Sequence, residues 1–170
     1  INPADWGRKE LSFARDLGIN RISIGVQSFD DAELSLMGRR HSSAQAIRTL
    51  EDAVVADFGN LSIDLIYGLP RQQFHQWRKS LEQALTFKPS HLSCYELEIK
   101  PNTPLGKRYD QGDFPVRTEE EQRKFFMRTS ELLEKAGYVH YEISNFARNM
   151  EGASRHNQKY WDHTPYLGLG

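Results

Sequence analysis

One carboxylate inside an apolar run constrains this chain more than any other feature. Residues 62–70 read Ser-Ile-Asp-Leu-Ile-Tyr-Gly-Leu-Pro, which predicts a short buried strand ended by a glycine and a proline. Asp64 lies in the middle of that run, and an unpaired charge buried there would cost several kcal/mol. Two interpretations stay open. Asp64 pairs with one of the arginines, or the strand faces a polar lumen where strand ends handle ligands.

Size and composition limit the fold and exclude several partners. With 170 residues, the chain can form one domain with a core, but it is too short for an eight-unit barrel of roughly 250 residues. A net charge of −1 does not indicate nucleic acid binding. No apolar run predicts a transmembrane helix, and the single Cys94 rules out an internal disulfide, so a cytoplasmic location is expected. The chain lacks an initial methionine and stops in mid-pattern, so we expect an excerpt of a longer protein.

Helical and strand-like patterns alternate through the first hundred residues. Strands are predicted at 20–26, 63–69 and 90–99, and the intervening helices are expected to end near Gly38, Gly59 and Pro89. The first helix is predicted to start at Asn2-Pro3, to end at Gly18 and to pack through Trp6, Phe13, Ala14 and Leu17. The helix capped by Ser42 or Ser43 is predicted to pack through Ile47, Leu50, Val54 and Phe58. This alternation predicts an α/β fold with parallel strands and helices outside.

The pattern changes after Pro101. Residues 102–116 are rich in proline, glycine and charge and are predicted to form a surface loop. Thr118 and Glu121 have the spacing of a capping box, which predicts a long helix up to Gly137. One strand is expected at residues 138–146, and a tail with little periodicity at 154–170 gathers aromatic and histidine side chains, Tyr166 among them.

Three polar residues follow successive strands and could share a site. Gln27 ends the first strand, Asp64 lies in the second, and Arg39 follows the first strand after one short helix. The carboxyl ends of parallel strands form one mouth, where these groups would suit a zwitterionic or ribose-bearing ligand. Arginine would hold a carboxylate, and aspartate would accept from hydroxyls or an amine. The alternative is that Gln27 and Arg39 merely face solvent.

A second group of interest is the stretch His-Asn-Gln-Lys-Tyr-Trp at residues 156–161. A histidine followed by two aromatic rings could ligate a metal or haem iron while the rings pack on a macrocycle. The simpler interpretation is a surface histidine beside ordinary aromatics. The other histidines lack the spacing of a zinc site, and Cys94 inside a strand is most simply a small core residue.

Taken together, several stretches resemble one family. The segments 20–29, 37–41, 63–70 and 91–103 are similar to the radical S-adenosylmethionine (SAM) enzymes related to oxygen-independent coproporphyrinogen III oxidase. The segment 141–147, Tyr-Glu-Ile-Ser-Asn-Phe-Ala, and the His-Asn-x-x-Tyr-Trp motif at 156–161 resemble the HemW branch, whose members are regarded as haem chaperones. The resemblance spans essentially the whole chain.

The resemblance implies a fold. The family fold is a partial (β/α)6 barrel with a C-terminal extension, so residues 1–101 would form the last three β/α units. Residues 102–170 would form a linker loop, a helix and the start of an α+β C-terminal region.

The resemblance also implies cofactors. Gln27, Arg39 and Asp64 match positions that contact SAM, and His156 matches a histidine proposed to ligate haem iron. The cysteines that hold the 4Fe-4S cluster lie upstream in the family, and no cluster cysteine is present here. We therefore expect the 170 residues alone to be inactive.

Two functions follow from this resemblance. The first is a haem chaperone that binds SAM, a 4Fe-4S cluster and haem. The second is an oxygen-independent coproporphyrinogen III oxidase, which decarboxylates two propionates in haem synthesis. The tail motif favours the chaperone. Haem or a porphyrin is the expected ligand in either case; a haem-accepting protein and a homodimer are further partners that the sequence leaves open.

Overall fold

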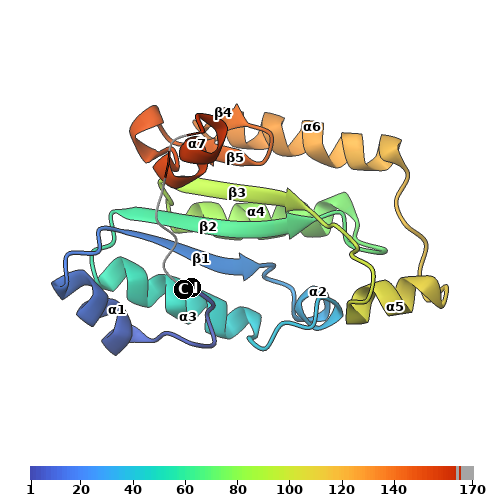
Figure 1. Ribbon diagram of the computed structural model, residues 1–170, viewed down its shortest axis with the longest axis horizontal. Helices are drawn as coiled ribbons and strands as arrows, with labels where there is room; N and C mark the ends of the chain where they lie inside the picture. The colour runs from blue at the N-terminus through green and yellow to red at the C-terminus, as the bar shows by residue number, and fades with distance from the viewer. Residues whose placement is uncertain (164, 166–170) are drawn as a thin grey trace.

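The computed structural model describes residues 1–163 and 165, and its centre is a five-stranded sheet in the order β1-β2-β3-β5-β4 (Figure 1). Strands β1 (Arg21–Gln27), β2 (Asn60–Tyr67) and β3 (His91–Glu96) are parallel, as the alternation of patterns predicts. Strand β5 (Asn145–Ala147) runs antiparallel to β3, and β4 (Val139–Glu142) is antiparallel to β5. The result is an α/β fold with a sheet that is mostly parallel.

Helices join the strands and flank the sheet. Their bounds are α1 (Arg8–Asp16), α2 (Asp31–Leu36), α3 (Ser43–Val55), α4 (Phe74–Thr86), α5 (Pro104–Asp110), α6 (Glu119–Lys135) and α7 (Arg155–Trp161). Figure 1 shows α4 behind β2 and β3, with α7 and α5 at opposite ends of the sheet. No helix among the described residues is long and apolar enough to cross a membrane.

Capping chemistry places most helix ends where the sequence predicts them. The side chains of Asp30, Ser42 and Thr118 accept hydrogen bonds from backbone N–H groups in the first turns of α2, α3 and α6. Beyond α1 and α6, Gly18 and Gly137 have φ values of 90° and 85°, which glycine adopts without steric cost. These local signals therefore mark where α2, α3 and α6 begin and where α1 and α6 end.

Two predicted helix faces are only partly confirmed: Ala14, Leu50 and Phe58 are buried as predicted, but other residues of the two faces are exposed. Helix α1 begins at Arg8 rather than at Pro3, and Phe13 and Leu17 are 63% and 66% exposed. Its buried residues are Leu11 and Ala14. Helix α3 likewise buries Ala46, Thr49, Leu50 and Ala53, whereas Val54 is exposed. Phe13, Leu17 and Val54 lie outside these buried stripes and are exposed.

The second half of the chain differs most from the prediction. The expected loop at residues 102–116 contains helix α5, which Thr103 caps and Pro104 opens. The single strand expected at 138–146 is a hairpin of β4 and β5. The tail expected to lack periodicity contains α7, capped by Ser154. Tyr166 lies outside the described residues.

The sheet has two chemically different faces. Side chains at alternate positions, such as Ile24, Ile63 and Leu92, are fully buried and form one core with the inward residues of α1, α3, α4 and α6. The intervening positions of the same strands carry polar groups, including Ser23 and Asp64. Because strand side chains alternate between faces, the helices cover the apolar face and the other face is available for polar contacts.

Candidate functional site

Polar residues lie side by side across the face of the sheet opposite the apolar core. Gly25 of β1 pairs with Asp64 of β2, which pairs with Ser93 of β3, and Ser93 in turn pairs with Asn145 of β5. Residues paired across adjacent strands project their side chains to the same face. This row therefore runs from the edge strand β1 across the parallel part of the sheet into the hairpin.

Asp64 is stabilised by a hydroxyl donor rather than by an ion pair. The Ser23 Oγ donates to the carboxylate and lies 3.0 Å from Oδ1 and 2.9 Å from Oδ2. No arginine or lysine of the described chain forms a salt bridge with Asp64, so the ion-pair interpretation is wrong for these residues. Burial raises the pKa of Asp64, an effect that the hydrogen bonds from Ser23 and Ser93 partly offset. Burial disfavours the charged form of Asp64, so a ligand that supplies further hydrogen-bond donors would stabilise the carboxylate.

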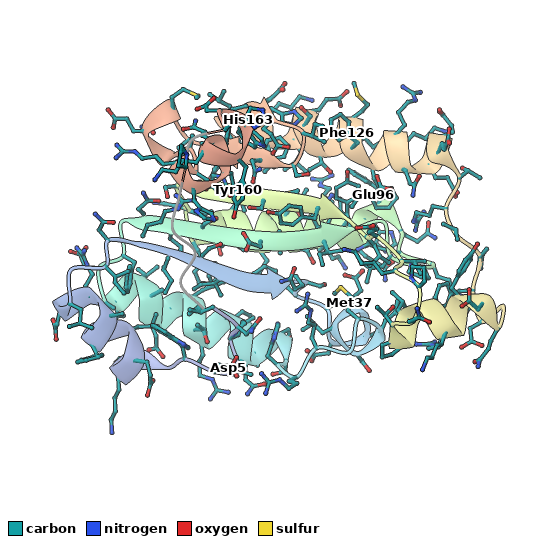
Figure 2. The ribbon with its side chains drawn as sticks, viewed as in Figure 1. Asp5, Met37, Glu96, Phe126, Tyr160 and His163 are labelled. Atoms are coloured by element: carbon teal, nitrogen blue, oxygen red, sulfur yellow. The ribbon has the colours of Figure 1, made fainter. Side chains whose placement is uncertain are left out.

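The three polar residues proposed from the sequence line one cleft at the carboxyl ends of the strands. We call it the carboxyl-end cleft, and it has a volume of about 480 Å³. Its lining residues are Gln27, Met37, Arg39, Asp64, Ile66, Tyr95, Glu96, Leu97, Glu98 and Leu105. Figure 2 labels Met37 and Glu96 at this end of the sheet. The arrangement combines an amide, a guanidinium and carboxylates with apolar walls, which is the usual composition of a small-molecule site.

Gln27 reaches this cleft through an unusual backbone conformation. Its φ is 67°, and the pairing of β1 with β2 shifts register between Gly25 and Gln27. The Gln27 side chain folds back over Gly25: a Cβ added at Gly25 would lie only 2.7 Å from Gln27 Nε2. Gly25 therefore leaves the space that the amide of Gln27 occupies. A left-handed non-glycine residue at a strand end is a form of strain that often accompanies binding sites.

The lining of the carboxyl-end cleft suits the charged and polar groups of SAM. The described residues do not suit an iron–sulfur cluster. Arg39 is exposed and makes no side-chain hydrogen bond or ion pair within residues 1–163 and 165, so its donors can take a ligand carboxylate. Asp64 can accept from hydroxyls or an amine, and Ile66 and Leu97 offer apolar wall. Cys94 is buried in β3, where burial raises the pKa of its thiol. A single inert cysteine cannot supply the thiolates of a cluster.

His156 lies at the other end of the sheet. It lines a second cleft, which we call the amino-end cleft, of about 380 Å³. The lining residues are Asn20, Arg21, Asn60, Glu151, Ala153, Ser154, Arg155 and His156. Asn20 precedes β1 and Asn60 opens β2, so this cleft lies where the parallel strands begin. The structure thus does not bring His156 together with Gln27, Arg39 and Asp64.

The side chain of His156 is exposed on α7. Its ring meets the edge of the Tyr160 ring at a centroid distance of 5.1 Å, and Tyr160 and Trp161 are each about half exposed. These rings offer aromatic surface beside an imidazole, but the cleft itself is walled mainly by polar groups. His156 and its neighbours therefore fit an axial ligand on an open surface, not an enclosed apolar haem pocket.

A buried hydrogen-bond chain that the sequence patterns did not reveal holds α7 to the sheet. His91 Nδ1 lies 2.8 Å from Ser62 Oγ, and His91 Nε2 lies 2.7 Å from the Tyr141 hydroxyl. That hydroxyl also accepts from the backbone N–H of Ser154, the capping residue of α7. Burial lowers the pKa of His91 to about 3, so the ring is neutral. The one available signal is the position of His91 on the polar side of its strand.

Known proteins match this chain in sequence and in fold. Residues 2–84 match the model of the radical SAM superfamily. Over 170 residues the chain is 41% identical to "Heme chaperone HemW" of Synechocystis, and 41% identical to the mitochondrial "Radical S-adenosyl methionine domain-containing protein 1" of Mus musculus. The matched regions cover 100% and 99% of this chain, but only 41% and 38% of those two proteins. The chain therefore spans about two fifths of the length of these curated relatives.

The fold comparison agrees with the sequence match. The solved structure of coproporphyrinogen III oxidase (HemN) from Escherichia coli superposes with a TM-score of 0.74 over 95% of this chain and 36% of that chain, at 23% identity. At that identity, the likeness describes the fold alone.

Residues 2–84 therefore carry a domain of the radical SAM superfamily. Within that superfamily its sequence is HemW-like, because relatives described as HemW haem chaperones match it over nearly its whole length at 34–41% identity. The resemblance inferred from the sequence motifs is thereby confirmed.

Proposed function

We propose that these residues are the second half of a radical SAM barrel and the start of its C-terminal region. The three parallel strands would be the last three units of a (β/α)6 barrel, with residues 102–170 as linker and extension. The outer edge of β1 supports this arrangement, because Ile1 pairs with it. The backbone N–H of Gly25 donates to the Ile1 carbonyl at 2.9 Å, and the amino group of Ile1 donates to the Ser23 carbonyl at 2.7 Å. This is the bonding pattern of a neighbouring parallel strand.

The carboxyl-end cleft is the proposed SAM site. The observation that carries this proposal is the convergence of Gln27, Arg39 and Asp64 on one cleft. Arg39 would hold the carboxylate of SAM, and Asp64 would accept from its hydroxyl or amino groups. Gln27 would contribute its amide beside them. A guanidinium binds a ligand carboxylate favourably, because both groups are charged and two parallel hydrogen bonds can form.

The radical chemistry depends on groups outside this chain. A 4Fe-4S cluster, when bound, supplies the electron that cleaves SAM to a radical. None of the residues described here can ligate the cluster, so they would bind and orient SAM only. We expect the 170 residues alone to show no cluster signal by electron paramagnetic resonance after reconstitution with iron and sulfide. Appearance of such a signal would contradict this assignment.

His156 is the proposed axial ligand of haem. An imidazole on an exposed helix, with the rings of Tyr160 and Trp161 beside it, would let haem bind and leave without opening a closed pocket. That property suits a protein that passes haem to another protein, and the HemW-like sequence supports it. We therefore propose a haem chaperone as the function of the whole protein. The likeness to coproporphyrinogen III oxidase carries no argument beyond the fold.

A haem titration of the full-length protein tests this function. Binding is followed at the Soret band for wild type, His156→Ala and, as a matched control, His75→Ala, which removes another exposed histidine from α4. We expect saturable binding in wild type and control and a loss of at least tenfold in affinity for His156→Ala. Equal binding in all three proteins would remove the ligand role of His156. Absence of binding combined with turnover of coproporphyrinogen would favour the oxidase.

A further inference from the structure

The amino-end cleft contains a cation whose donors are only partly used. Arg21 at the start of β1 is half-buried, and both of its hydrogen bonds come from one nitrogen. Nη1 donates to Asn60 Oδ1 at 2.6 Å and to the Gly152 carbonyl at 3.2 Å. Nε and Nη2 have no protein acceptor within the described chain, and no carboxylate there forms an ion pair with Arg21. These two nitrogens form the edge that binds a carboxylate bidentately.

The setting of Arg21 makes an unpaired guanidinium costly. Burial lowers the pKa of Arg21, which shows that the charged form loses solvation where it lies. Neutral acceptors such as Asn60 and the Gly152 carbonyl compensate only part of that loss. A partly desolvated arginine usually has an anionic partner. An anion entering from the cleft would supply it.

The rest of the cleft favours the same kind of ligand. Arg155, exposed at the first position of α7, lines the cleft and makes no side-chain hydrogen bond or ion pair with a described residue. Asn20 and Asn60 contribute amide groups, and Glu151 is the one acidic lining residue. Two guanidinium groups and the imidazole of His156 therefore face one carboxylate, and the cleft has a net preference for negative charge.

The neighbouring surface indicates what the anion is attached to. His156 lines the cleft and also contacts the ring of Tyr160, so it stands between the polar cleft and the aromatic surface of α7. A ligand that spans both would have a flat aromatic body and acidic arms. We propose that the amino-end cleft is a carboxylate-binding subsite in which Arg21 and Arg155 hold the propionates of the porphyrin whose iron His156 ligates. The identity of the body rests on the proposed function; the carboxylate specificity rests on the cleft.

The test compares acid and ester forms of one porphyrin on the full-length protein. Iron-free protoporphyrin IX and its dimethyl ester are titrated by fluorescence, so that no axial ligand is required. We expect wild type to bind the acid at least tenfold more tightly than the ester, the scale of a charge-assisted hydrogen-bonded pair. Arg21→Met should bring this ratio close to one, and Arg155→Met should reduce it severalfold. Arg78→Met, which removes an exposed arginine from α4, should leave it unchanged.

The outcomes separate a structural role from a binding role. If Arg21→Met weakens the acid and the ester equally and Arg155→Met changes neither, then Arg21 only supports the fold and the proposal is overturned. Equal affinity of wild type for acid and ester also overturns it. Arg155→Met keeps the test informative, because the exposed side chain of Arg155 makes no hydrogen bond or ion pair with residues 1–163 or 165.

A parallel haem titration distinguishes this inference from the function on which it rests. If His156→Ala leaves haem binding unchanged while the acid-to-ester ratio still depends on Arg21, the ligand role of His156 fails and the carboxylate subsite stands. If His156→Ala abolishes haem binding while the ratio is one, the reverse holds. If the protein binds neither porphyrin form nor haem, both proposals are overturned.

Discussion

The two ends of the sheet carry opposite kinds of polar chemistry. On β2, Asp64 lines the carboxyl-end cleft; its carboxylate accepts from the Ser23 hydroxyl of β1, and burial raises its pKa. At the amino ends of the same strands, burial disfavours the charged form of Arg21, and its guanidinium donates to Asn60 Oδ1. Ser23 and Asp64 thus lie within four residues of Arg21 and Asn60 along their strands. Two sites of opposite charge can share strands because each strand presents separate side chains at its two ends.

This difference teaches how one fold can hold two ligands without competition. Along β2, Asn60 of the amino-end cleft lies four positions from Asp64 and six from Ile66 of the carboxyl-end cleft, about 13 Å and about 20 Å in an extended strand. The two clefts share no lining residue, so a ligand in one contacts none of the side chains that line the other. If this account is correct, substitutions at one end should change the affinity for one ligand only. Substitutions at each end of the sheet test that independence, from the largest expected effect to the smallest.

The largest effect is expected for Asp64→Asn in the cluster-reconstituted full-length protein. The variant keeps an oxygen that accepts from Ser23 but loses the charge offered to SAM, so SAM affinity should fall roughly 10- to 100-fold. Haem affinity should change by no more than about twofold, because Asp64 does not line the amino-end cleft and its charge acts on Arg21 there without a salt bridge. Calorimetry for SAM and Soret titration for haem measure the two. A loss of affinity for both SAM and haem would show that the two clefts are not independent.

Gly25→Ala should weaken SAM binding by about tenfold with little change in stability. The new Cβ would meet Gln27 Nε2 at 2.7 Å, whereas its other neighbours lie at 3.6 Å, so the amide of Gln27 would move and the strand would remain. Thermal unfolding and SAM titration provide the measurements. Gly59→Ala is the matched control, because nothing lies within 4 Å of a Cβ there. Unchanged SAM affinity in Gly25→Ala would show that Gln27 does not contribute to the site.

Tyr141→Phe should loosen α7 and weaken haem binding about fivefold while SAM binding persists. The lost hydroxyl joins His91 to the backbone N–H of Ser154, and such bonds contribute about 1 kcal/mol each. Faster trypsin cleavage after Arg155 or Lys159 reports the loosening without haem. Tyr138→Phe is the control, since its hydroxyl donates to the Pro89 carbonyl and not to α7. Equal cleavage rates in wild type and Tyr141→Phe would show that this hydroxyl does not anchor the helix.

The smallest effect is a gain in stability for Asp64→Asn without ligand. Because the folded pKa of Asp64 is raised above its ordinary value of 3.8, its ionisation opposes folding at neutral pH. The variant should be about 1 kcal/mol more stable at pH 7. This advantage should shrink as the pH falls through the raised pKa and vanish below 3.8, where Asp64 is protonated in both states. Urea unfolding at pH 7 and pH 3 checks the sign, with exposed Asp16→Asn as control. Destabilisation at pH 7 would contradict it.

Local signals explain which parts of the fold could be predicted. The strands β1, β2 and β3 follow from apolar periodicity, and caps such as Asp30 and Thr118 act within one turn of their helices. The hairpin of β4 and β5 was not predictable in this way, because its turn at Ile143 and Ser144 contains neither glycine nor proline. Helix α5 was concealed by loop-like composition, although Thr103-Pro104 is a helix-start signal.

The same distinction applies to the candidate sites. The convergence of Gln27, Arg39 and Asp64 could be predicted because the carboxyl ends of parallel strands lie at one edge of the sheet. The position of His156 could not, since α7 is held near the amino ends of the strands by tertiary contacts such as that of Tyr141 with His91 and Ser154. No spacing in the sequence encodes that contact. Arg21 was missed for the same reason, because its cleft exists only once α7 has packed.

The most direct test of two separate sites is a haem titration of the full-length protein with and without saturating SAM. The account predicts the same haem dissociation constant, within twofold, in both titrations, because the ligands occupy opposite ends of the sheet. An apparent constant that rises in proportion to the SAM concentration would mean that the two compete for one site. That result would contradict the account.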